Sequence, residues 1–226
     1  MLSILKSDAF NKKKETKVAK VVTFANVKGG SGKSTLCINM AAILIRAGYS
    51  VAILDSDQQK CSQDWITGTK DKLLSRVEII EPAELKAAED VEVDFLLIDT
   101  QGSLTKEMAQ FLFQSSLIIT PCRVSRDDIV GQGWIEVFLK QSNQNLKKAP
   151  ILTVLNGVNK RSSILSHVIE QLKEDGVQVA ETCISQRVCF AETNVNKISV
   201  IGYNKHATDE IVDLTNEALN LIKSEA

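Results

Sequence analysis

The chain has 226 residues, which suits one α/β domain with a full core, and aromatic residues make up only 5% of it, as in parallel sheets that helices cover on both faces. Its formal net charge is −1, so the molecule as a whole does not attract nucleic acid electrostatically, and any nucleic-acid surface has to be a local basic patch. The five cysteines are widely spaced and form no C-x-x-C pair, which argues against a disulfide scaffold, a zinc site or an iron–sulfur cluster.

The first 17 residues are polar and rich in lysine. We expect a flexible basic N-terminal arm over residues 1–17, followed by a single domain over residues 18–226. Such an arm can be merely disordered, or it can contact nucleic acid or a partner. Met1–Leu5 is too short for a signal peptide, and Lys6 interrupts it. No apolar run is long enough to span a bilayer, so we expect a soluble, intracellular protein.

Predicted strands and helices alternate along the rest of the chain. The apolar run Val18–Val27 predicts a strand, and Leu36–Ala47 predicts a helix that ends at Gly48. The next predicted strand is Val51–Leu54. Further predicted strands are Val77–Ile80, Phe95–Ile98, Leu117–Ile119, Ile151–Leu155 and Val177–Val179. One further helix is predicted to start near Pro82 and another to end near Gln114. The remaining predicted helices are Asp127–Gln141, Ile164–Glu174 and residues 207–223. Repeated βα units predict an α/β fold with a doubly wound, mostly parallel sheet and helices on both faces.

A glycine-rich segment, the phosphate loop (residues 28–35), separates the first strand from the first helix. Such a turn directs several backbone N–H groups and the positive end of the helix at one point, a geometry that binds phosphate. Lys33 can reach the β- and γ-phosphates, and the Ser34 hydroxyl can hold Mg²⁺. The segment predicts a P-loop NTPase that binds a nucleoside triphosphate. The candidate nucleotide-binding residues here are Lys28, Gly29, Gly30, Ser31, Gly32, Lys33, Ser34 and Thr35.

Three carboxylates follow two of the predicted strands. Asp99 ends the strand at Phe95–Ile98, and Asp55 and Asp57 follow Val51–Leu54. Ligands of such sheets bind at the carboxyl ends of the strands, so Asp99 is typical of a Walker B aspartate that holds Mg²⁺ through water. An aspartate after a strand is also common in polar turns. Gly102 could let a backbone N–H approach the γ-phosphate.

The loop departs from the general pattern, because Val27 stands where that pattern has glycine and a second lysine, Lys28, opens the loop. The combination K-G-G-x-G-K-[ST] resembles the deviant Walker loop of the ParA/MinD family. This resemblance implies that Lys28 crosses a dimer interface to the nucleotide of the partner subunit. Residues 55–59 resemble the family motif Asp-x-Asp-Pro-Gln, with Gln58 in place of proline. By that match Asp55 supports the water shell of Mg²⁺ and Asp57 orients the attacking water.

Further segments extend the resemblance over nearly all of residues 18–223. Residues 118–128 resemble the family's strand-Pro-x-x-x-Ser-x-x-Asp segment, with Arg126 as a departure, and residues 184–188 resemble its late arginine-containing loop. Residues 99–104 carry a Gly-Ser-Leu loop that is similar to that of the short, ParF-like plasmid partition ATPases. Trp65 is interpreted as packing. Asn156 can contact adenine or form a turn.

The resemblance implies slow hydrolysis of ATP to ADP and phosphate, with Lys28, Lys33 and Asp57 in catalytic roles and Mg²⁺ held by Ser34, Asp55 and Asp99. It also implies an ATP-bound homodimer that binds DNA non-specifically on the nucleoid, without a membrane. A centromere-binding adaptor of the ParB or ParG kind would stimulate hydrolysis. Candidate DNA contacts, each of which can equally be an ordinary surface cation, are Arg187, Lys160, Arg161, Lys197 and Lys205.

Three other functions stay open on the sequence. A positioner of other cellular cargo would share every motif described so far. A regulator of the cell-division site of the MinD kind needs a basic amphipathic tail, whereas residues 207–226 carry five acidic residues against one lysine and would be repelled by anionic lipid. A synthetase on the same fold would have no use for Lys28 across an interface.

Overall fold

The structure is a computed structural model that describes residues 18–83, 90–103, 105–125, 135, 137–138 and 149–224. Several sequence predictions fall on residues outside these ranges. They are the basic arm at residues 1–17, the helix near Pro82 beyond residue 83, Leu104, Arg126, and most of the helix predicted at Asp127–Gln141.

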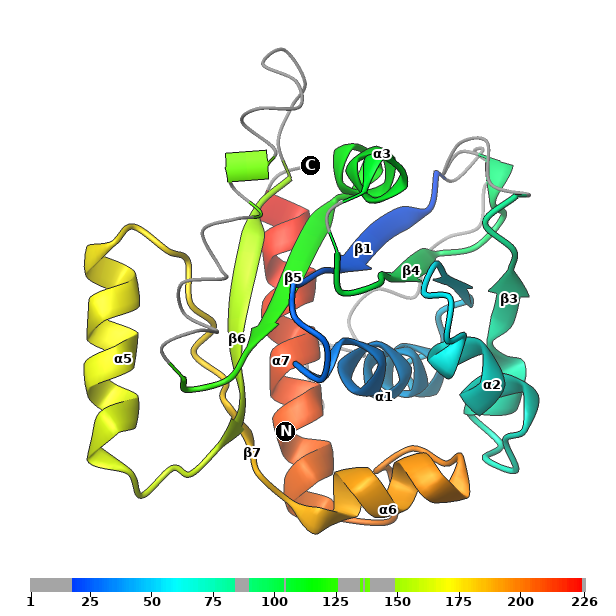
Figure 1. Cartoon of the computed structure of the whole chain (residues 1–226). Helices are drawn as coiled ribbons and strands as arrows, with labels where there is room; N and C mark the ends of the chain where they lie inside the picture. The colour runs from blue at the N-terminus through cyan, green and yellow to red at the C-terminus, as the bar shows by residue number, and fades with distance from the viewer. Residues whose placement is uncertain are drawn as a thin grey trace.

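Seven strands form one sheet in the order β3-β2-β4-β1-β5-β6-β7, and every pair of neighbours is parallel. This confirms the predicted doubly wound sheet, which Figure 1 shows with β1 near its centre. Strands β2, β4 and β5 are buried along their whole length, which explains why they read as continuous apolar runs. The strands are β1 (Lys20–Phe24), β2 (Val51–Asp55), β3 (Glu78–Ile80), β4 (Phe95–Asp99), β5 (Leu117–Cys122), β6 (Ile151–Val158) and β7 (Ile184–Ser185).

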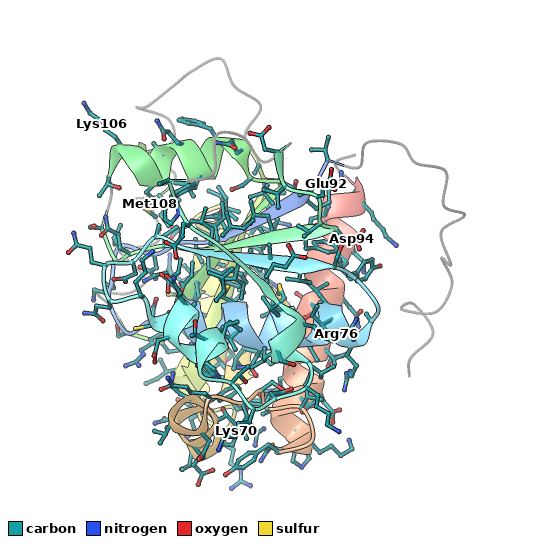
Figure 2. All side chains as sticks on the ribbon, turned by 90° about the vertical axis from the view of Figure 1, so that its right-hand side faces the viewer. Lys70, Arg76, Glu92, Asp94, Lys106 and Met108 are labelled. Carbon is teal, nitrogen blue, oxygen red and sulfur yellow. The ribbon has the colours of Figure 1, made fainter. Side chains whose placement is uncertain are left out.

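Helices cover both faces of the sheet. Helices α1 (Lys33–Arg46) and α7 (Lys205–Ser224) pack on one face together with α2 (Cys61–Thr67), and α3 (Lys106–Gln114) lies on the opposite face (Figure 1). In Figure 2, Met108 of α3 points toward the sheet and Lys106 points away from it. The remaining elements are the short 3₁₀ helix η1 (Leu74–Arg76), α5 (Ser163–Glu174) and α6 (Val188–Asn196). None of the helices within the described ranges is long and apolar enough to cross a bilayer.

Strand register sets the geometry of the functional edge. Asp55 at the end of β2 lies opposite Asp99 at the end of β4, and Asp99 also lies opposite Phe24 at the end of β1. The phosphate loop begins shortly after β1. The two carboxylates and the phosphate loop therefore meet at the carboxyl edge of the sheet, as predicted.

One predicted strand is wrong. Val179 forms only an isolated bridge with Thr153, and the edge strand is β7, two residues long, at Ile184–Ser185. The side chains of Val177 and Val179 do pack against an apolar cluster. Their apolar character therefore reflects burial of side chains rather than a continuous ladder of backbone hydrogen bonds.

Candidate nucleotide site

Backbone conformation shapes the phosphate loop. Gly30 and Gly32 have φ angles of 72° and 101°, which side chains with a Cβ rarely adopt. Gly32 also caps α1, and a Cβ placed on it would lie 2.1 Å from Nδ2 of Asn156. Glycine is thus required there for conformation and for space. Lys33, Ser34 and Thr35 follow in the first turn of α1, so their backbone N–H groups and side chains lie at the positive end of the helix.

Two asparagines hold the phosphate loop in place. Asn156, at the end of β6, donates from Nδ2 to the carbonyl oxygen of Ser31 at 2.7 Å. Asn26 accepts from the backbone N–H of Lys28 at 2.9 Å and donates to the carbonyl oxygen of Pro121 at 2.6 Å. The structure places Asn156 beside the phosphate loop, and a contact with adenine stays a prediction. The sequence analysis did not single out Asn26, whose only sequence signal is a polar amide near the end of an apolar run, just before a glycine-rich turn.

Lys33 is buried against the phosphate loop. Its residue is 7% exposed, and its Nζ donates to the carbonyl oxygen of Lys28 at 3.3 Å. Burial lowers the pKa of Lys33, while the charges of Asp99 and Asp57 raise it. A buried ammonium next to a glycine-rich loop, with few acceptors of its own, is suited to bind a phosphate oxygen.

Asp99 is the most perturbed carboxylate of this edge. Its pKa is raised from 3.8 to about 6, chiefly by burial and also by the charge of Asp55, while the hydroxyls of Ser34 and Ser62 and the charge of Lys33 lower it. The Ser62 hydroxyl donates to its Oδ2, whereas Oδ1 is buried without a hydrogen-bond partner among the described residues. A buried carboxylate oxygen that lacks a donor is stabilised by a cation or by an ordered water.

Asp55 ties the following loop to the start of α2. Its Oδ1 accepts from the backbone N–H of Asp57 at 3.0 Å, and its Oδ2 accepts from those of Ser62 and Gln63 at 2.8 and 3.1 Å. Burial raises the pKa of Asp55, and these three hydrogen bonds oppose that change. The carboxylate therefore supports the loop as well as the metal site predicted for it.

Asp57 lies in a tight turn between these attachment points, the Asp57 loop (residues 56–60). Its Oδ1 accepts from the backbone N–H of Gln59 at 3.0 Å. Lys60 closes the loop in a left-handed conformation (φ 51°), and its Nζ donates to the carbonyl oxygen of Asp55 at 2.6 Å. The Asp57 side chain is partly exposed at the edge where Lys33 lies, and its role in orienting water stays a prediction.

Gly102 brings a second loop against the phosphate loop. A Cβ on Gly102 would lie 3.0 Å from the backbone nitrogen of Gly29 and 3.2 Å from the carbonyl carbon of Lys28. The segment after β4 therefore packs backbone to backbone on the segment after β1. This places Gly102 where the sequence predicted it, beside the phosphate loop.

The side chains present fit the predicted Mg²⁺. Mg²⁺ in phosphate sites takes one or two carboxylates and keeps water and phosphate oxygens as its other ligands. Asp55 and Asp99 would supply the carboxylates and Ser34 a hydroxyl, and Oδ1 of Asp99 is an oxygen without a hydrogen-bond partner among the described residues. No group of three or more His, Cys, Asp or Glu side chains is arranged for a metal in the described part of the chain.

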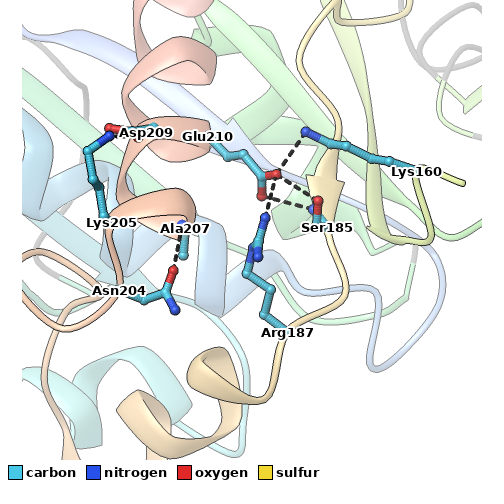
Figure 3. Close-up of polar contacts among 8 residues, drawn as sticks. All are labelled: Lys160, Ser185, Arg187, Asn204, Lys205, Ala207, Asp209 and Glu210. Atoms are coloured by element: carbon cyan, nitrogen blue, oxygen red, sulfur yellow. Dashed lines mark hydrogen bonds and ion pairs between the residues drawn. The ribbon is translucent and has the colours of Figure 1, made fainter.

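Most of the candidate DNA contacts form ion pairs with acidic residues of the same chain. Two of them belong to the Glu210 cluster, which consists of Glu210, Lys160, Ser185 and Arg187 (Figure 3). Lys160 Nζ lies 2.8 Å and Arg187 Nη2 lies 3.2 Å from Oε1 of Glu210, and Ser185 donates to Glu210 through its N–H and its hydroxyl. The pKa of Glu210 is about 2, because donation from Lys160, Ser185 and Arg187 outweighs the effect of burial.

The other three candidate cations do not belong to the Glu210 cluster. Lys197 pairs with Asp64 at 2.9 Å, and Lys205 pairs with Asp209 one helical turn away at 2.7 Å. Arg161 is exposed and forms no ion pair with another residue of the described ranges. Trp65 is 2% exposed and belongs to the main core, which agrees with its interpretation as packing.

Known proteins share the sequence pattern and the fold of this chain. A family profile described as the CobQ/CobB/MinD/ParA nucleotide binding domain matches residues 22–200. The maintenance of carboxysome distribution protein A of Halothiobacillus neapolitanus is 24% identical over 204 residues, which cover 86% of this chain and 94% of that protein. Protein ParA of Rhizobium radiobacter is 22% identical over 179 residues, which cover 76% of this chain and 80% of ParA.

Solved structures show the same fold. A Borrelia burgdorferi protein assigned to plasmid partition, solved with bound AMPPNP, superposes with a TM-score of 0.71 at 19% identity and covers 92% of this chain and 100% of its own. This likeness confirms the predicted P-loop fold. Because the family profile spans well over half of the sequence, this chain belongs to the CobQ/CobB/MinD/ParA nucleotide-binding domain family.

Proposed function

We propose that the protein is an ATP-dependent partition ATPase, in which ATP binding joins two subunits and hydrolysis separates them. The observation that carries this proposal is the meeting of the phosphate loop with Asp55, Asp57 and Asp99 at one edge of the sheet. The two curated relatives are named for carboxysome distribution and as ParA, which supports a role in positioning a cargo.

In this proposal the residues of the site divide the work of phosphoryl transfer. The amides of the phosphate loop and the Lys33 ammonium bind the phosphates and offset the charge that develops on them. Asp57 orients the attacking water. Mg²⁺, held by Ser34, Asp55 and Asp99, adds further charge neutralisation when bound. Positioning dominates over covalent chemistry, so basal turnover is slow and a charged group from a partner can accelerate it.

Lys28 provides the test of dimerisation. It opens the phosphate loop at a partly exposed position, and in a facing pair it would reach the partner's triphosphate. Light scattering of the wild type with Mg²⁺ and AMPPNP should show a dimer. The Lys28→Ala variant should bind the nucleotide and stay monomeric, while Lys70→Ala, an exposed lysine away from the phosphate loop, should dimerise like the wild type. A wild type that stays monomeric with bound nucleotide would refute this part of the proposal.

We further propose that the ATP-bound dimer binds DNA without sequence preference and that an adaptor protein stimulates hydrolysis. Phosphate contacts release counterions, so affinity should fall steeply with salt. The Glu210 cluster occupies Arg187 and Lys160, whereas Arg161 is exposed nearby in sequence. Alanine at Arg187 should weaken DNA binding and leave ATP binding intact. Alanine at Arg161 compares an exposed cation with one paired internally, and equal DNA affinity in both variants and the wild type would remove both from the interface.

A second candidate is a positioner of another cellular cargo, which the similarity to the carboxysome distribution protein favours. Both functions use the same switch, and they differ in the adaptor. Testing the products of neighbouring genes for stimulation of hydrolysis would separate them. Co-sedimentation with anionic vesicles tests the membrane-bound alternative, which α7 disfavours because Asp209, Asp213 and Glu217 lie along it.

A further inference from the structure

Ser62 lies between the two carboxylates of the metal site. It is in the first turn of α2 and is 0% exposed. Its backbone N–H donates to Oδ2 of Asp55 at 2.8 Å, and its hydroxyl donates to Oδ2 of Asp99. A single residue thus contacts both acids, which lie opposite each other on neighbouring strands.

This contact holds one oxygen of the Asp99 carboxylate, and the Ser34 hydroxyl also interacts with that carboxyl and lowers its pKa. A carboxylate can rotate about its Cβ–Cγ bond unless a donor fixes one oxygen. The Ser62 hydroxyl occupies Oδ2, and Oδ1 is left buried without a donor in the part of the chain that the structure describes. Because Asp55 holds the backbone of Ser62, the hydroxyl is itself a fixed donor.

We propose that Ser62 is a positioning residue that holds Asp99 so that Oδ1 is presented to the Mg²⁺ of the nucleotide site. The inference rests on the proposed function, since it takes the metal role of Asp99 from there. Groups that orient a metal-binding carboxylate change metal affinity when they are removed, although they never touch the ion. A serine that only filled the core would change stability and leave metal affinity as it was.

A second serine offers a matched control. The Ser56 hydroxyl also donates to Asp99, but to its backbone carbonyl oxygen at 3.2 Å. Removing the Ser56 hydroxyl therefore deletes a hydrogen bond to the same residue without freeing its carboxylate. The two variants Ser62→Ala and Ser56→Ala separate orientation of the carboxylate from attachment of the backbone.

The experiment measures Mn²⁺ binding to the AMPPNP-bound protein by electron paramagnetic resonance. Ser62→Ala should weaken Mn²⁺ binding about ten-fold, the usual effect of losing an outer hydrogen bond to a metal ligand. The affinity for AMPPNP in EDTA should stay within about two-fold of the wild type, because no phosphate contact is removed. Ser56→Ala should bind Mn²⁺ like the wild type.

If Ser62→Ala does not fold, Ser62→Cys replaces it, because a thiol keeps the position filled but is a weak donor. It should then bind Mn²⁺ more weakly than both the wild type and Ser56→Ala. Unchanged Mn²⁺ affinity in the folded Ser62 variant would overturn the inference while leaving the proposed function intact. A wild type that binds no nucleotide would instead overturn the proposed function.

Discussion

Two buried carboxylates of this molecule, Asp99 and Glu210, have environments of opposite kind. Asp99 lies beside another acid, has one oxygen without a partner in the described structure, and has a pKa raised to about 6. Glu210 accepts from two cations and from Ser185, and its pKa is lowered to about 2. An incompletely satisfied charge indicates a site that awaits a ligand, whereas a fully satisfied one indicates an internal link between elements.

Mutations in the two regions should therefore have different effects. Changes at the nucleotide edge should alter chemistry and leave stability the same or higher. Changes in the Glu210 cluster should reduce stability and leave chemistry the same. A mutation with the opposite outcome would contradict this difference between the two regions.

The largest effect is expected for Asp57→Ala. Loss of the group that orients the attacking water should slow phosphate release about 10²–10⁴-fold, the range for a removed acid–base group. ATP affinity, measured by equilibrium binding, should change little, because Asp57 is proposed to contact the attacking water and not the phosphates. Turnover at the wild-type rate would show that another group orients the water.

Glu210→Gln should lower the free energy of unfolding by about 2 kcal/mol, because it leaves Lys160 and Arg187 without their anion. Chemical denaturation measures this, and ATP affinity should not change. Asp209→Asn is the matched control on the same helix. Its partner Lys205 is exposed, so the loss should stay under about 0.5 kcal/mol.

Asp99→Asn should act in the opposite direction in EDTA. Removing a buried charge whose pKa is raised should increase the free energy of unfolding by about 1–2 kcal/mol at pH 7. Hydrolysis should be lost in the same variant. A less stable Asp99→Asn protein without nucleotide would contradict the idea that this edge is unsatisfied.

Acid should remove the contribution of Glu210. Its pKa lies below the ordinary value of 4.5, so the stability that it provides is complete above pH 4.5 and is lost as the pH falls toward 2. Between pH 7 and pH 3 the difference in unfolding free energy between the wild type and Glu210→Gln should shrink by about 1 kcal/mol, allowing for screening at the half-exposed Lys160. A constant difference would mean that the charge of Glu210 contributes nothing.

The sequence predicted the parts of the fold that depend on long apolar runs. The central strands and the helices α1, α3, α5 and α7 agree with the structure. Four short elements, α2, η1, α6 and β7, were not predicted, because their signals are not local. No side chain caps α2 or α6 at the N-terminus.

For the site, the glycine-rich loop and the position of Asp99 after a strand predicted the edge of the sheet at which these residues meet, and their roles stay predictions. The loop residues, Asp55, Asp57, Gly102 and Asn156 all lie at the predicted edge. Sequence spacing could not find Ser62 or Glu210, because their roles depend on contacts with residues 37 and 25 positions away. Arg187 lies in the loop expected from the resemblance, but only the structure shows its ion pair.

The three hydrogen bonds that Asp55 accepts have a consequence for how this chain can vary. They fasten both ends of the Asp57 loop to one carboxylate, so the segment between them forms a closed ring of fixed size. Proline in that segment would restrict the backbone by its own covalent ring. In this chain the hydrogen bonds to Asp55 restrict the segment instead. Glutamine can therefore stand at position 58 while Asp57 keeps its place.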